Sequence, residues 1–335
     1  MPNWMQTVAR QMDAHTRSWE YGKMSLSRRS ALIRTEHEWS VAIPYRLDLT
    51  VSVLRRLSSN LTDVLTPDGE YLRALGGSRT LVVARVAQAD PATLAISLEG
   101  HEREHPRALA ILRRVLGVDR DLAHFDRAAA HISWLKPLAK RMRGVRPPRY
   151  PTLWEACVNA VVFQQISLIA ATAIMRRLIV GLGQSLVTDD VQHYSFPSMT
   201  SFLATDDDRL RGAGLSAGKL MTLRRVGEAL AAGTIDETVL EQQTSPGAAA
   251  SLCQIKGIGP WTAAVILLRG LGRLDVFPMN DTSVTRNLAL VSRSRIDVER
   301  TLRALSPQQG MLYYHLLLAR LESRQDLGRP SRQGA

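Results

Sequence analysis

A turn built on two glycines, followed at some distance by an aspartate, carries the most distinctive chemical groups of the sequence. Gly257 and Gly259 flank a single residue, Pro260 follows them, and Asp281 comes twenty residues after Trp261. Glycine lets a backbone come close to a ligand, and proline is favoured at the first position of a helix. Because the amide groups at a helix N-terminus favour an anion, we expect a phosphate group at this turn.

Asp281 can return to the turn that precedes it. A helix over residues 260–270 is about 16 Å long, and ten extended residues span more than about 30 Å. Asp281 stands at the expected start of the next helix, where aspartate is also a preferred N-cap. The two roles are compatible, because a helix N-terminus keeps a carboxylate ionised, and an ionised carboxylate stabilises a developing cation.

Two neighbouring side chains support a phosphate at the glycine turn. Lys256 lies in the turn itself, and Thr262 follows it with a hydroxyl group. Glycine turns also join helices in many proteins that bind no nucleic acid, so the turn alone is weak evidence. A turn that contacts only phosphates reads no base sequence. The pattern therefore predicts DNA binding without sequence preference.

The elements that must position these groups are mainly helical. Over residues 39–103, short β-rich runs alternate with turn signals, which predicts a small antiparallel sheet domain with one helix near residues 47–57. Residues 104–322 form a helical body, so the fold class is mainly α with a small α+β N-terminal domain. We expect a basic arm over residues 1–38 and a disordered tail over residues 323–335. The body's predicted helices span 106–116, 119–133, 153–163, 168–182, 199–204, 207–212, 216–232, 247–254, 260–270, 282–291, 297–304 and 307–322.

Composition points to a polyanionic partner. The 335 residues include 43 Lys and Arg against 31 Asp and Glu, a net charge of +12. Such an excess favours nucleic acid, although an anionic membrane surface, or simply a basic soluble protein, would fit the same composition. The apolar runs are too short to span a bilayer, and the first residues lack the apolar core of a signal peptide. We expect an intracellular protein, cytoplasmic or associated with the nucleoid.

Two cysteines and one basic stretch further limit the classes of protein to which the chain could belong. Cys157 and Cys253 both lie in apolar runs, so the chain offers neither a disulfide framework nor a set of iron-sulfur ligands. Residues 136–149 carry six basic side chains and no acidic one. A solvated loop accounts for them as well as a DNA-binding segment does. Thr152 and Glu155 then form a capping box at the start of a helix.

Taken together, these motifs resemble those of a known family. The run LCQIKGIGPWTAAVILLRG, followed by DVFPMND, is similar to the hairpin and aspartate of the helix-hairpin-helix superfamily of DNA glycosylases, in its 3-methyladenine DNA glycosylase II branch. LWEACVNAVVFQQISLIAATAIMRRL and LRGAGLSAGKLMTLRRVGEAL resemble two further core segments of that branch. The resemblance covers residues 40–322. It implies the helix-hairpin-helix DNA glycosylase fold, with the hairpin at 247–270, preceded by an antiparallel β-sheet domain.

The resemblance also implies an activity. Such an enzyme flips a damaged base, here an alkylated purine, out of double-stranded DNA and hydrolyses its N-glycosidic bond, which starts base excision repair. Asp281 would be the catalytic carboxylate. Trp261 occupies the position where bifunctional relatives carry a nucleophilic lysine, which implies a monofunctional enzyme without lyase activity. We expect it to act as a monomer.

The same resemblance assigns further residues. A loop of three residues would intercalate into the space that the flipped nucleotide leaves, namely Gln164, Gln165 and Ile166. Five residues would bind the DNA backbone, namely Lys256, Gly257, Gly259, Thr262 and Lys219. Four would line the base pocket, namely Trp261, Val265, Thr282 and Leu317. Tyr313, Tyr314 and His315 lie close in sequence to Leu317 and could supply aromatic rings there, although such residues more often belong to the core or the rim.

A cation and two alternative functions complete the expectations. The backbone carbonyls of Cys253 and Ile255 would hold a structural Na⁺ or K⁺, whereas no cofactor is required and no iron-sulfur cluster is expected. The same fold could act on oxidised or deaminated bases. It could also be a non-catalytic helix-hairpin-helix protein that binds DNA damage through residues 136–149 and the hairpin. The presence of Asp281 favours the enzyme.

Overall fold

The computed structural model describes residues 32–76, 80–279, 281–292 and 295–330. Most of the predicted basic arm and the last five residues of the predicted tail therefore lie outside the described residues. Across the part that is described, no helix is both long enough and apolar enough to cross a membrane.

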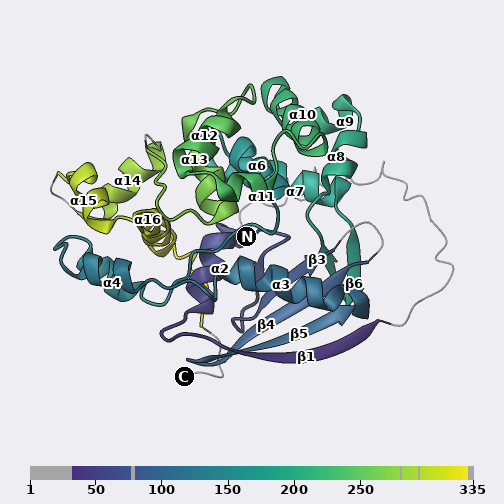
Figure 1. The fold of residues 1–335 in the computed structure, drawn as a ribbon. Helices are drawn as coiled ribbons and strands as arrows, with labels where there is room; N and C mark the ends of the chain where they lie inside the picture. Colours follow the sequence, from purple (N-terminus) through teal and green to yellow (C-terminus); the bar gives the residue numbers. More distant parts are fainter. Residues whose placement is uncertain (1–31, 77–79, 280, 293–294, 331–335) are drawn as a thin grey trace, which may run out of the picture. The chain divides into compact units, whose positions relative to one another are not determined.

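A five-stranded antiparallel sheet opens the described chain (Figure 1). Leu94, Ile96 and Leu98 alternate with more exposed residues along the strand that contains them, so one face of the sheet is buried. Two helices, α2 (Leu47–Arg55) and α3 (His105–Leu116), pack on this face. The strand order is β1-β5-β4-β3-β2. The strands are β1 (Ile33–Ser40), β2 (Val64–Leu65), β3 (Tyr71–Leu75), β4 (Val82–Asp90) and β5 (Thr93–Gly100).

A helical body follows the sheet, as the sequence predicted. Many of its helices begin with a side-chain cap, and Thr152 accepts a hydrogen bond from the Glu155 amide at the predicted capping box. The helices are α4 (Ala123–Ala130), α5 (Lys136–Arg141), α6 (Leu153–Val162), α7 (Leu168–Leu182), α8 (Met199–Ala204), α9 (Asp207–Gly212), α10 (Ala217–Ala231), α11 (Glu237–Gln242), α12 (Ser245–Cys253), α13 (Pro260–Ile266), α14 (Thr282–Val291), α15 (Val298–Leu305) and α16 (Gly310–Ser323).

Several boundaries differ from the expected ones. Strand β1 begins at Ile33, so the end of the predicted arm belongs to the sheet, where it pairs with β5. Part of the predicted solvated loop at 136–149 is helix α5, which begins with a proline in its first turn. Helix α11 and a hairpin of two strands, β6 (Ser185–Thr188) and β7 (Val191–Tyr194), were not predicted.

The predicted disordered tail is wrong for its described part. The amide of Gly328 donates to Ser52 Oγ at 2.8 Å, and Arg55 donates to the carbonyl of Asp326 at 3.0 Å. Leu327 packs against the apolar cluster that α2 shares with α16. The chain after α16 therefore returns to the helix that follows the first strand.

Candidate active site and DNA-binding hairpin

The glycine turn joins α12 to α13 as the sequence predicted. Gly257 has a φ of 105°, in the left-handed region, and a side chain there would place a Cβ 2.0 Å from the hydroxyl of Thr222. Gly259 is different, because a Cβ there would meet nothing within 4 Å. Lys256 is exposed beside them. The turn therefore presents an open backbone surface and a cationic side chain at the N-terminus of α13.

Gln164 links the predicted intercalating loop to the hairpin. Its side-chain nitrogen donates to Thr262 Oγ1 at 2.6 Å and to the carbonyl of Gly257 at 3.3 Å. Thr262 is only 3% exposed. The predicted contact of Thr262 with a phosphate is therefore wrong, because its hydroxyl faces Gln164 inside the protein. Gln164 likewise serves as a bridge and is not the tip of the loop.

Lys219 holds the same loop from the other side. Its ammonium group donates to the carbonyl of Val162 at 2.7 Å and to that of Gln164 at 2.9 Å. Burial lowers the pKa of Lys219. The structure thus gives Lys219 two backbone carbonyls at the end of α6 in place of the predicted DNA phosphate.

The tip of this loop is exposed. Gln165 has a φ of 54°, a left-handed conformation that is unusual for a residue with a side chain. Ile166 is 38% exposed, and Ile169, in the first turn of α7, is 72% exposed. Ser167 caps α7 by accepting a hydrogen bond from the Ala170 amide. One exposed isoleucine therefore follows Gln165 on a loop that Gln164 and Lys219 fix in place, and a second lies in the first turn of α7.

Asp281 lies at the start of α14. Its carbonyl accepts a hydrogen bond from the Val284 amide at 3.0 Å, and the residue is half-buried. Burial raises the pKa of Tyr313, and the charge of Asp281 raises it further. The backbone of Thr282 begins the helix, whereas its side chain lies outside the described residues. Asp281 is therefore close enough to α16 for its charge to act on Tyr313.

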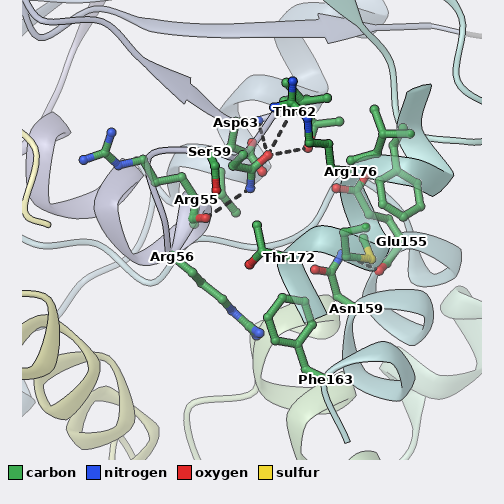
Figure 2. Close-up of a pocket in the computed structure, with 16 residues that line it drawn as sticks. Arg55, Arg56, Ser59, Thr62, Asp63, Glu155, Asn159, Phe163, Thr172 and Arg176 are labelled. Carbon is green, nitrogen blue, oxygen red and sulfur yellow. Dashed lines mark hydrogen bonds between the residues drawn. The ribbon is translucent and has the colours of Figure 1, made fainter. Parts of the chain in front are cut away.

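A buried arginine that sequence reasoning missed lies in the same region. Arg56 directly follows α2, is 9% exposed, and places its guanidinium 4.2 Å from the ring centre of Phe163. Figure 2 shows Arg56 extending toward Phe163, while Arg55 points away. Burial and the neighbouring Arg269 lower the pKa of Arg56, and the charge of Asp281 opposes that shift. No local sequence pattern marked Arg56, which follows a helix that is buried from Leu47 to Leu54 and therefore has little solvent to reach.

Comparison with known proteins agrees with this geometry. Residues 158–307 match the family described as the HhH-GPD superfamily base excision DNA repair protein. The DNA-3-methyladenine glycosylase 1 of Schizosaccharomyces pombe is 30% identical over 175 residues, which are 50% of this chain and 73% of that protein. This chain belongs to the helix-hairpin-helix DNA glycosylase superfamily. Its resemblance to the 3-methyladenine branch is confirmed.

Two further relatives show how far the likeness extends. The DNA-3-methyladenine glycosylase of Bacillus subtilis is 26% identical over 174 residues, 52% of this chain and only 57% of that enzyme. The solved 3-methyladenine DNA-glycosylase of Archaeoglobus fulgidus has a TM-score of 0.71 at 21% identity, covering 86% of this chain and 99% of that one. The 8-oxoguanine glycosylase/lyase of Clostridium acetobutylicum, bound to double-stranded DNA, has a TM-score of 0.67 at 12% identity, covering 87% and 98%. The glycosylase fold therefore extends beyond the helical body to the sheet.

Val265 was predicted to line the base pocket, and this assignment is wrong. It is 2% exposed and belongs to the apolar core of the helical body. Trp261 is half-buried against the same core, and its indole Nε1 is buried without a hydrogen-bond partner among the described residues. Leu317 is half-buried against the cluster formed by α16. Packing against hydrophobic neighbours explains Val265, because a helix of this apolar character buries most of its faces.

The basic stretch 136–149 is only partly available to DNA. Arg146 is buried and donates to the carbonyls of Ala42 and Pro44, at 2.7 and 3.2 Å. Arg149 donates to the carbonyl of Gly270 at 3.0 Å. These two arginines satisfy backbone carbonyls between segments of the protein. A binding module that holds DNA through the whole stretch is therefore not supported.

Proposed function

We propose that the protein is a monofunctional DNA glycosylase that removes alkylated purines from double-stranded DNA and so starts base excision repair. It acts as a monomer, inside the cell. One observation supports this most strongly: Gln164 bonds the intercalating loop directly to the hairpin, at Thr262 and Gly257. Contact with a phosphate and entry into the base stack would then be made by one rigid unit. The names of the Bacillus and Schizosaccharomyces relatives support 3-methyladenine as a substrate.

Binding begins at the hairpin. The exposed Lys256 and the free amide groups at the start of α13 face one phosphate, where a helix N-terminus favours negative charge. The loop tip, with Gln165 and Ile166, then fills the space that the extruded nucleotide leaves. Because unstacking costs less for a damaged base, the same step favours lesions over intact DNA.

Bond cleavage is assigned to Asp281. Breaking the N-glycosidic bond builds positive charge on the sugar, and a carboxylate near that charge stabilises the transition state. The same carboxylate orients the attacking water and accepts its proton. Trp261 stands in the first turn of α13, where a lyase would carry its lysine, and an indole forms no Schiff base.

The hairpin also fits a monovalent cation. The carbonyl of Ile255 accepts one hydrogen bond, from the Ile258 amide at 2.9 Å, and keeps a second lone pair. Neutral carbonyls such as those of Ile255 and Cys253 suit Na⁺ or K⁺. When bound, the ion adds positive charge next to the phosphate site. Cys253 and Ile255 themselves hold the turn that presents Lys256.

A panel of single-lesion duplexes tests the proposed function. We expect the wild-type protein to release 3-methyladenine or 7-methylguanine and to leave an abasic strand intact until alkali is added. Asp281→Asn should lower base release by at least about a hundredfold while abasic DNA still binds, since the charge is removed and the shape is kept. Asp275→Asn, an exposed position in the same connection, is the matched control. Near-normal release by Asp281→Asn would refute the catalytic assignment.

A further inference from the structure

Arg56 occupies an unusual position at the end of α2. Its backbone has a φ of 60° and a ψ of −45°, although the residue is not glycine, and its amide still donates to the carbonyl of Ser52. A positive φ in a residue with a side chain is unfavourable and persists only where the surroundings impose it. This conformation accompanies the turn of the side chain away from Arg55 and toward Phe163 (Figure 2).

The guanidinium of Arg56 is buried with unused hydrogen-bonding capacity. Its Nε is inaccessible to solvent and has no hydrogen-bond partner among the described residues. A buried donor without an acceptor is costly, and the face of Phe163 compensates for only part of the lost hydration. The adjoining cavity, lined also by Asn159 and Thr172, has a volume of about 30 Å³. That is space for about one water molecule, so the cavity itself offers the guanidinium at most about one acceptor.

Packing brings Arg56 to the side of the site that contains Asp281. Helix α16 packs against both α2 and α14, and these helices adjoin Arg56 and Asp281. Tyr313, in the first turn of α16, is influenced by the charges of both Arg56 and Asp281. Phe163, under the guanidinium, is the residue directly before the intercalating loop. An extruded base that reaches Asp281 therefore comes close to a cation as well as to a carboxylate.

The positive charge of Arg56 and the negative charge of Asp281 suit two different classes of leaving base. When the bond to the sugar breaks, its electron pair goes to the base, and water supplies hydroxide to the sugar carbon while Asp281 takes the water's proton. A cationic base such as 7-methylguanine leaves as a neutral molecule. A neutral base leaves with a negative charge, which a nearby guanidinium stabilises through charge-assisted hydrogen bonds.

We propose that Arg56 determines specificity by stabilising the negative charge that develops on neutral alkylated purines as they leave, so that the enzyme removes these in addition to cationic ones. This inference rests on the proposed function. It assigns to the sheet domain, through α2, a direct part in choosing the substrate.

The test compares two lesions in the same protein samples. Release of 1,N6-ethenoadenine, a neutral alkylated purine, and of 7-methylguanine is measured under single-turnover conditions. We expect Arg56→Gln to lower the first rate at least about tenfold and the second less than about threefold. Arg56→Lys, which keeps the charge, should recover part of the loss. Arg55→Gln is the matched control, because Arg55 binds the carbonyl of Asp326 on the other side of α2.

The ratio of the two rates decides the question, because any loss of folded protein cancels in it. An equal fall for both lesions in Arg56→Gln would give Arg56 a structural role only and overturn the inference. So would a wild-type enzyme that releases 7-methylguanine and leaves 1,N6-ethenoadenine in place. A wild-type protein that releases neither these bases nor 3-methyladenine would instead overturn the proposed function itself.

Discussion

At the scale of single residues, the two glycines of the hairpin lack a side chain for different reasons. Gly257 has a left-handed backbone and lies against Thr222, so both conformation and packing exclude a Cβ. Gly259 has a φ of −98° and a ψ of 177°, an extended conformation that any residue adopts. No protein atom lies within 4 Å of where its Cβ would be. If DNA approaches this turn, only Gly259 leaves space that the protein itself does not use.

Alanine substitutions should separate these two reasons. Gly257→Ala should lower the free energy of unfolding by about 1–3 kcal/mol, because the Cβ meets Thr222 and the φ is unfavourable. Gly259→Ala should leave the melting temperature unchanged and weaken binding to every duplex alike, because a methyl group then separates the backbone from a phosphate. Thermal melting and titration with an abasic duplex check both. A Gly259→Ala protein that binds as well as the wild type would place DNA elsewhere.

At the scale of the elements, the loop between α6 and α7 depends on neighbours that are far away in sequence. Gln164 reaches the hairpin at Thr262, and Lys219 reaches back from α10 to two carbonyls at the end of α6. Together these bonds fix the direction in which Gln165 and Ile166 project. A lysine in this position contributes by ordering the loop and not by neutralising DNA.

The salt dependence of binding distinguishes Lys219 from Lys256. Each phosphate contact that a protein loses reduces the slope of log K against log salt by about 0.9. We expect Lys256→Met to reduce the slope by about that amount. Lys219→Met should leave the slope unchanged and lower the rate of base release, since two carbonyls lose their donor and the loop loosens. A reduced slope in Lys219→Met would restore the phosphate contact that the sequence predicted.

The elements were largely predictable because their signals are local. Periodicity, the capping box at Thr152 and the glycines of the turn located the sheet, most helices and the hairpin. Helix α5 escaped because it lies in a basic run and no side chain caps it, whereas the equally short α8 and α9 follow the caps Ser198 and Asp206. Helix α11 was missed although Asp236 caps it. The roles of Lys219 and Arg56 depend on contacts with residues far away in sequence, to which local patterns are blind. Val265 was misassigned because alignment with a pocket position does not reveal burial in the core.

At the scale of the whole molecule, a buried ionic network joins the sheet to the helical body. Arg73, on β3, donates to both carboxylate oxygens of Glu155, on α6, at 2.7 Å, and it also bonds to Asp63. Tyr71 donates to Asp63 at 2.8 Å. One guanidinium therefore faces two buried carboxylates, which leaves one negative charge uncompensated. Removing one member of such a buried set is costly, so the network helps to fix the position of the sheet against α6.

This uncompensated charge should make stability depend on pH. Burial raises the pKa of Glu155 from 4.5 to about 7, against the opposing effect of Arg73. A carboxyl with a higher pKa in the fold binds a proton on folding, so the stability it adds is fully present below about pH 4.5 and is lost as the pH rises through about 7. We expect the free energy of unfolding, measured in urea, to fall by about 1–3 kcal/mol from pH 5 to pH 8.

Glu155→Gln isolates this contribution, because the amide carries no titrating proton and has nearly the same shape. The variant should lose most of the fall between pH 5 and pH 8, whereas Glu299→Gln, at an exposed position on α15, should keep it. An equal fall in Glu155→Gln and the wild type would assign the pH dependence to other groups. If the network also sets the position of α2, Glu155→Gln should change the release of 1,N6-ethenoadenine more than that of 7-methylguanine, because only the former is proposed to need Arg56 in place.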